Sequence, residues 1–155
     1  MKKLFFTIPL IATLLLTSCG KSKIADSTQE FPENCWLRFE PAVFTTSPAK
    51  TDRTYNVCLS ITFDTTKLGY STLPLLVNFY ADSNEMHTFI PDMRLRDKNG
   101  QLRGTTITKF CTVTDTIDKL RTYNHAVPYT YRIKQRTSKY ELYGVTSINL
   151  TIAEN

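Results

Sequence analysis

The sequence is poor in the residues on which many enzymes with recognisable motifs depend. It contains only five glycines and two histidines. A dinucleotide fingerprint or a phosphate-binding loop needs several glycines at short fixed spacings, and these five are too dispersed to supply them. The Gly-x-Ser-x-Gly turn that presents a nucleophilic serine is also missing. The chain therefore lacks the motifs of common nucleotide-binding proteins and serine hydrolases.

Ligands for metal ions are equally scarce. His87 and His125 are too few for a histidine-rich zinc site, and the four cysteines show no Cys-x-x-Cys spacing. Asp97-x-Asn99-Gly100 has the first residues of a calcium loop, but the glutamate expected several residues later is missing, and a hairpin turn explains the motif. The sequence predicts no catalytic residue, no metal site and no cofactor, and we expect the protein not to be an enzyme.

The one long apolar run lies at the N-terminus. Lys2 and Lys3 precede an apolar stretch from Leu4 to Leu16, which is the order and size of a secretory signal peptide. A membrane-spanning helix needs roughly 20 apolar residues, so a spanning segment is the weaker interpretation.

The residues Leu16-Thr17-Ser18-Cys19 follow directly and have the form of a bacterial lipobox. We therefore predict that residues 1–18 are a lipoprotein signal peptide, that cleavage precedes Cys19, and that acyl chains such as palmitate are attached to Cys19. Several chains, each adding about 0.8 kcal/mol per buried CH₂, would anchor the protein permanently. An ordinary cleaved signal followed by an incidental cysteine is the alternative.

The segment after the cysteine is polar. Residues 20–30 show no apolar period, and we expect residues 19–30 to be the lipidated cysteine and a flexible tether with a reach of about 18 Å. Neither an aspartate nor an acidic cluster follows Cys19, since the next residues are Gly20, Lys21, Ser22 and Lys23. Bacterial sorting by these positions favours the outer membrane, with the domain facing the periplasm.

Charge argues against a nucleic-acid partner. Cleavage removes Lys2 and Lys3, so the net charge falls from +5 to +3, and no dense block of Lys and Arg remains. The expected partners are the membrane, through the lipid, and proteins of the cell envelope.

Strand-like alternation dominates residues 31–155. Apolar and polar residues alternate from Tyr55 to Phe63, from Val127 to Lys134 and from Ile148 to Ile152. Asn99-Gly100 suits a tight hairpin turn. Further strand-like runs lie near residues 37–39, 73–80, 88–96, 102–107 and 113–117. These patterns predict an all-β fold, a single antiparallel β-sandwich domain of about seven to nine strands rather than a small barrel.

Two surface features could bind a partner. Arg132, Lys134 and Arg136 occupy alternate positions of one predicted strand, so they would project from one face about 7 Å apart and could meet an acidic partner or anionic headgroups. A solvated outer face is the alternative, because basic residues also discourage edge pairing. The second feature is a set of aromatic residues outside the predicted core registers, which could stack on sugar rings: Trp36, Tyr123, Tyr140 and Tyr143.

The sequence does not decide whether any two of the remaining cysteines, Cys35, Cys58 and Cys111, form a disulfide. The predicted compartment permits disulfides, but the odd number leaves at least one thiol unpaired. One bridge could form in three ways, and three buried free thiols are equally compatible with the sequence.

Several short motifs, in order, resemble those of the gliding motility-associated lipoprotein H family. They are the lipobox, Phe31-Pro32-x-x-x-Trp36, Tyr55-Asn56-Val57, Tyr70 with Leu73-Pro74-Leu75, Leu95-x-Asp97-x-x-Gly100 with Gly104, Tyr131-x-Ile133-x-Gln135, and Leu142-x-Gly144-Val145. The family's usual glycine before the late tyrosine is lacking, and Arg136-Thr137 replaces its Met-Arg. The resemblance implies an all-β lipoprotein without known catalysis, associated with the cell-surface gliding machinery. Two functions remain open: a non-enzymatic accessory of an envelope machine, or a glycan-binding lipoprotein.

Overall fold

The computed structural model describes residues 21–81 and 86–155. Within these ranges it contains twelve strands and one short 3-10 turn. In chain order they are β1 (Lys23–Glu30), η1 (Pro32–Asn34), β2 (Cys35–Leu37), β3 (Ala42–Thr45), β4 (Tyr55–Asp64), β5 (Thr72–Tyr80), β6 (Met86–Phe89), β7 (Asp92–Arg94), β8 (Thr105–Ile107), β9 (Phe110–Arg121), β10 (Thr130–Gln135), β11 (Glu141–Tyr143) and β12 (Val145–Glu154).

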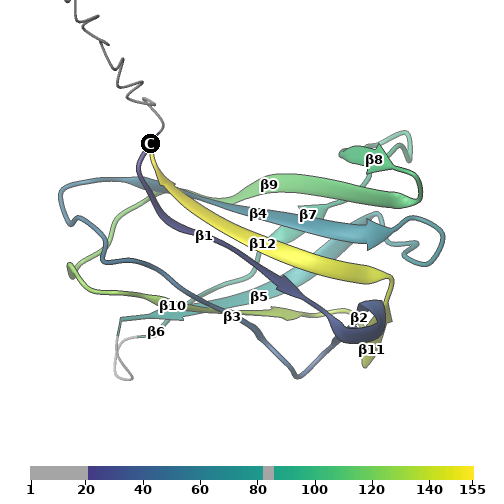
Figure 1. The fold of residues 1–155 in the computed structure, drawn as a ribbon, viewed down its shortest axis with the longest axis horizontal. Coiled ribbons are helices and arrows are strands. Elements are labelled where there is room, and N and C mark those ends of the chain that lie inside the picture. The colour runs from purple at the N-terminus through teal and green to yellow at the C-terminus, as the bar shows by residue number, and fades with distance from the viewer. Residues whose placement is uncertain (1–20, 82–85) are drawn as a thin grey trace, which may run out of the picture.

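The strands form two main sheets that face each other (Figure 1). The first sheet has the order β1-β12-β4-β9-β8, and the second has the order β3-β10-β5-β6, with β7 also paired to β5. Strands β2 and β11 form a separate two-stranded ribbon. Every strand pair in the sheets is antiparallel. The predicted all-β, antiparallel sandwich is confirmed, although several three-residue strands raise the count above nine.

The core lies between the sheets and follows the predicted alternation. Every second residue of β4 from Tyr55 to Phe63 is fully buried, and Ile148, Leu150 and Ile152 of β12 are buried in the same way. Apolar side chains on the inner face are removed from water, while the alternate positions hold hydroxyl pairs such as Ser60 with Thr114. Strand β10 begins at Thr130, later than predicted, and Val127 is 40% exposed in the preceding loop.

The Asp97–Gly100 segment is a turn, as predicted. The Oδ1 atom of Asp97 accepts hydrogen bonds from the backbone N–H groups of Asn99 and Gln101, at 2.8 and 2.9 Å. The backbone N–H of Gly100 donates to the Asp97 carbonyl at 3.0 Å, and Gly100 has φ of 80°. The carboxylate is therefore used to close the turn.

The prediction that residues 19–30 form a flexible tether is wrong for residues 23–30. Residues 23–30 form β1, an edge strand that pairs with β12 from Lys23–Ala153 to Glu30–Ser147. Only Ile24 and Ala25 of this strand are buried, so its apolar content is too small to give a period in the sequence. Backbone hydrogen bonds to β12 order the strand, and just three residues separate it from Cys19.

The two ends of the sandwich differ. The start of β1 and the end of β12 lie at one end, whereas the β2–β11 ribbon lies at the other (Figure 1). Along one side of the sandwich, the edge strands β1 and β3 lie against each other: the backbone N–H of Ser47 donates to the Ile24 carbonyl at 2.7 Å near the start of β1, and that of Val43 to Gln29 Oε1 at 3.0 Å near its end. The chain therefore enters the domain at the end remote from the ribbon.

Candidate functional site

The predicted basic row lies in the middle of the second sheet. Strand β10 runs between β3 and β5, and its Tyr131 and Ile133 are fully buried. Arg132 is exposed and Lys134 half-buried, so both point to the outer face. Arg136 is exposed one residue beyond the strand, where its N–H donates to the Pro74 carbonyl at 2.9 Å. The structure thus brings two of the three side chains onto the strand face and places the third at its end.

Both apolar and polar side chains lie beside these two cations. Arg132 lies opposite Val43 on one side and Asn78 on the other, and Lys134 lies opposite Leu76. Val43 is 49% exposed. A shallow cavity of about 430 Å³ is lined by Asn78, Tyr80, Met86, Arg132 and Lys134. We call this surface the basic face; it combines cations with exposed apolar groups, which is a composition suited to protein docking.

The four aromatic residues do not form one patch. Trp36 is fully buried: its ring stacks on Phe31 with centroids 4.9 Å apart, and its Nε1 donates to the Glu40 carbonyl at 3.2 Å. Tyr123 is 2% exposed, and its hydroxyl lies 2.7 Å from that of Tyr131. Removal from water raises the pKa of Tyr123 to about 12. The burial of Trp36 and Tyr123 therefore excludes an exposed patch made of all four rings.

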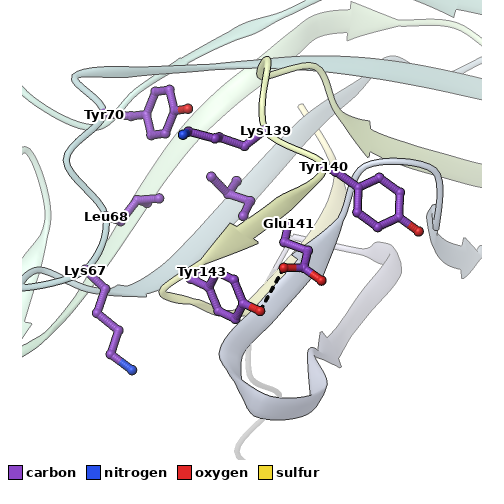
Figure 2. A pocket seen from close by; sticks show the side chains of 8 residues that line it. Lys67, Leu68, Tyr70, Lys139, Tyr140, Glu141 and Tyr143 are labelled. Carbon is purple, nitrogen blue, oxygen red and sulfur yellow. Dashed lines mark hydrogen bonds between the residues drawn. The ribbon is translucent and has the colours of Figure 1, made fainter.

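The other two tyrosines line one cavity at the ribbon end of the molecule (Figure 2). Its volume is about 480 Å³, and its lining residues are Lys67, Leu68, Tyr70, Lys139, Tyr140, Glu141, Leu142 and Tyr143. The exposed fractions of Tyr140 and Tyr143 are 55% and 51%. The hydroxyl of Tyr143 donates to Glu141 Oε2 at 2.8 Å, and this hydrogen bond to a carboxylate raises the pKa of Tyr143. We call this the tyrosine cavity.

Sequence reasoning missed one wall of this cavity. Lys67, Leu68 and Tyr70 come from the loop between β4 and β5, about 70 positions before the β11 wall. No local pattern connects two segments so distant along the chain, and only the sheet topology brings them together.

The loop wall is held by a buried carboxylate. Asp64 is 2% exposed at the end of β4, and its Oδ1 accepts hydrogen bonds from the Thr66 hydroxyl at 2.6 Å and the Thr66 N–H at 2.9 Å. Its Oδ2 lies 2.9 Å from Lys109 Nζ. The Asp64 carbonyl also accepts the N–H groups of Lys67 and Leu68. These bonds fix the loop from which the cavity wall projects.

This loop should lose stability in acid. The hydrogen bond from the Thr66 hydroxyl, aided by Lys109, lowers the pKa of Asp64 from 3.8 to about 2. A carboxylate with a depressed pKa in the folded state stabilises the fold above its unfolded pKa, and the contribution disappears as the pH falls from about 4 to about 2. Urea unfolding across this window should show a falling midpoint, with a shallower fall for Asp64→Asn. A midpoint equally sensitive to pH in both proteins would contradict this role.

Other chemistry is limited in the described part of the chain. Across residues 21–81 and 86–155, no three His, Cys, Asp or Glu side chains gather in a way that could hold a metal ion. Within the same ranges, no helix has the length and apolar character needed to cross a membrane. Cys35, Cys58 and Cys111 are free thiols in the structure, and Cys111 is buried. The predicted lipidation site Cys19 lies outside the described residues.

Comparison with known families gives a clear match. The profile of the GldH lipoprotein family covers residues 23–152, which is nearly the whole described domain. The chain belongs to the GldH lipoprotein family. No curated protein and no solved structure matches the chain. Membership of the GldH family identifies a membrane-anchored, gliding motility-associated lipoprotein, and this family is not a known enzyme family.

The GldH-like motifs mainly build the fold. Phe31 and Trp36 stack on each other in the core. A Cβ at Gly104 would lie 2.0 Å from the Thr112 carbonyl oxygen, so no side chain fits there. Gly144 has φ of 98°, and its Cβ would lie 3.0 Å from Lys67 Cβ. Gly144 therefore allows β11 and β12 to pass close to the loop that walls the tyrosine cavity.

Proposed function

We propose that the protein is a non-enzymatic accessory component of a cell-envelope machine. Lipid on Cys19 holds it on the outer membrane, facing the periplasm, and the basic face docks an acidic envelope protein. The GldH family match supports the lipoprotein assignment, and the residues after Cys19 favour the outer membrane. Lipid on Cys19 would supply the anchor and the basic face the docking surface, which are the two requirements of such a component.

The observation that carries the docking role is the position of Arg132 and Lys134. Strand β10 is an interior strand, so these cations are not needed to protect a sheet edge from pairing. They sit beside the exposed apolar groups of Val43 and Met86. An acidic partner would gain charge complementarity from the cations and apolar burial from their neighbours.

Charge reversal tests this docking surface. Changing Arg132, Lys134 and Arg136 together to Glu should leave folding intact, because all three lie outside the core. The loss of three exposed ion pairs with the acidic partner should weaken the free energy of binding by about 1.5 kcal/mol. The yield of crosslinked partner should therefore fall about tenfold, and more at low salt. The measurement is crosslinking in intact cells followed by pull-down of the anchored protein.

A matched triple variant provides the control. Arg38, Lys67 and Lys98 are exposed and lie away from the basic face, and changing them to Glu alters the net charge by the same amount. This control should crosslink as the unmodified protein does. Equal loss in both variants would show that net charge matters and that the basic face has no specific role.

The tyrosine cavity favours a second function, the binding of a glycan. Tyr140 and Tyr143 expose flat rings, and Lys139 extends towards Tyr70 on the opposite wall (Figure 2). The aromatic faces could stack on sugar rings, and the ammonium groups of Lys67 and Lys139 could pair with the carboxylates of sugar acids. Tyr140→Ala with Tyr143→Ala should abolish retention on immobilised envelope polysaccharide while leaving partner crosslinking unchanged. Retention of the double variant would exclude the cavity as a glycan site.

A further inference from the structure

The predicted lipid anchor is joined to the sandwich by a very short stretch of chain. Strand β1 begins at Lys23, so only residues 20–22 separate it from Cys19. The Ser22 carbonyl already accepts a hydrogen bond from the Glu154 N–H at 2.8 Å. Three residues span at most about 10 Å. Lipid on Cys19 would therefore keep this end of the sandwich against the lipid headgroups.

The same end carries an exposed apolar residue in a costly conformation. Leu120, near the end of β9, has φ of 54°, in the left-handed region that a leucine rarely adopts. Its side chain is 58% exposed, so burial in the core does not explain the conformation. The backbone N–H of Leu120 donates to Asn56 Oδ1 at 3.2 Å, and Asn56 Nδ2 donates to Asn155 Oδ1 at 3.0 Å. The register of the β4–β9 pairing shifts here, between Tyr55–Arg121 and Val57–Asp118, so a β-bulge accounts for the backbone conformation. The bulge leaves the apolar side chain of Leu120 exposed at this end of the sheet.

Leu120 lies close to Ser22, where the chain that follows the predicted anchor enters the domain. Strands β1, β12, β4 and β9 are consecutive in the first sheet, and strands are spaced by about 4.8 Å, so Leu120 is about 14 Å from Ser22 across the sheet. Lys119 is exposed beside it. Val127, 40% exposed, lies in the loop that leaves the same end of β9. We call Lys119, Leu120 and Val127 the anchor-end patch.

The acidic side chains at this end are paired with basic ones, so they should not repel an anionic lipid surface. Four ion pairs include them: Asp26 with Lys23 at 2.6 Å, Asp118 with Arg121, Glu154 with Lys50 at 3.1 Å, and Asp52 with Arg53 at 3.8 Å. Lys21 and Lys119 add positive charge at the same end. This charge complements anionic headgroups.

We propose that the anchor-end patch docks on the lipid surface that holds the acyl chains of Cys19, with Leu120 entering the headgroup region. This inference rests on the proposed lipidation of Cys19. Docking would fix the orientation of the domain, because the lipid and the patch are two separate points of attachment. The β2–β11 ribbon lies at the opposite end of the molecule (Figure 1). The tyrosine cavity, which β11 lines, would then point away from the membrane.

Tryptophan quenching in vesicles tests this contact. The full lipidated protein, carrying either Leu120→Trp or Tyr140→Trp, is placed in vesicles of phosphatidylethanolamine and phosphatidylglycerol brominated close to the headgroup. Trp36 is fully buried and gives the same background in both proteins. The Leu120→Trp emission should lose about half its intensity at interfacial depth, and the Tyr140→Trp emission should stay unchanged. Equal quenching at both positions, or none at position 120, overturns the proposal.

Two further measurements separate the possible failures. If the unmodified protein does not float with the vesicles, lipidation of Cys19 is wrong; if it floats while position 120 is unquenched, only the docking is wrong. Hydrogen exchange of the unsubstituted lipoprotein avoids any folding defect of the variants. In vesicles, amides 119–127 should exchange several-fold more slowly than in soluble Cys19→Ala protein, and amides 138–140 should not change. Equal exchange at 119–127 in both forms also overturns the docking.

Discussion

Replacing Ile61 with aspartate is expected to abolish cooperative folding. Ile61 is fully buried in β4, and its cross-strand neighbours Val113 and Ile148 are at most 1% exposed. An aspartate there would place an uncompensated carboxylate in the core, at a cost of about 4–5 kcal/mol or more, which is comparable with the whole stability of a small domain. Thermal unfolding followed by circular dichroism would show no cooperative transition.

The adjacent residue provides the control. Thr62 points to the outer face of the first sheet, where its hydroxyl lies 2.9 Å from that of Thr112. Thr62→Asp loses this hydrogen bond but keeps its charge near water, so we expect a loss of about 1 kcal/mol or less. Equal damage from Ile61→Asp and Thr62→Asp would mean that both faces of β4 are buried, contrary to the observed sandwich.

Cys19→Ala is expected to release the protein from the membrane. The substitution removes the thiol that carries the acyl chains, and acyl chains contribute about 0.8 kcal/mol per buried CH₂ to membrane binding. The anchor-end patch alone is small, so it should not retain the protein after a high-salt wash. Fractionation of cells should move the protein from the membrane pellet to the soluble fraction, and the mass of a lipidated N-terminal peptide should disappear.

Cys58→Ala is the matched control, because it removes another thiol and leaves the predicted lipobox intact. Its product should stay in the outer-membrane fraction of a density gradient. If Cys19→Ala protein stays in the pellet and resists salt extraction, the lipid-anchor hypothesis fails.

Much of the fold could be predicted because it depends on local alternation. The buried positions of β4 and β12 repeat every two residues, and each strand is long enough for the period to be recognised. Strand β1 could not be predicted in this way. It buries only Ile24 and Ala25, neighbours beside a register shift, and is held by backbone hydrogen bonds that the side chains do not reveal.

The candidate surfaces also include features that local sequence predicts and features that it does not. The outward direction of Arg132 and Lys134 follows from strand alternation, and the structure agrees. The burial of Trp36 and Tyr123 depends on partners distant in space, since Tyr123 packs against Tyr55 and Phe79 at centroid distances of 5.4 and 6.3 Å. Such aromatic contacts have no local sequence pattern.

Site-specific photocrosslinking in living cells tests the docking role most directly. A photoreactive phenylalanine at Val43 or Asn78 would flank Arg132 on either side of β10, and one at Ser60 would lie on the outer face of the other sheet. The account predicts a crosslinked envelope partner from positions 43 and 78 and none from position 60. A partner captured from position 60, with none from 43 or 78, would contradict docking through the basic face.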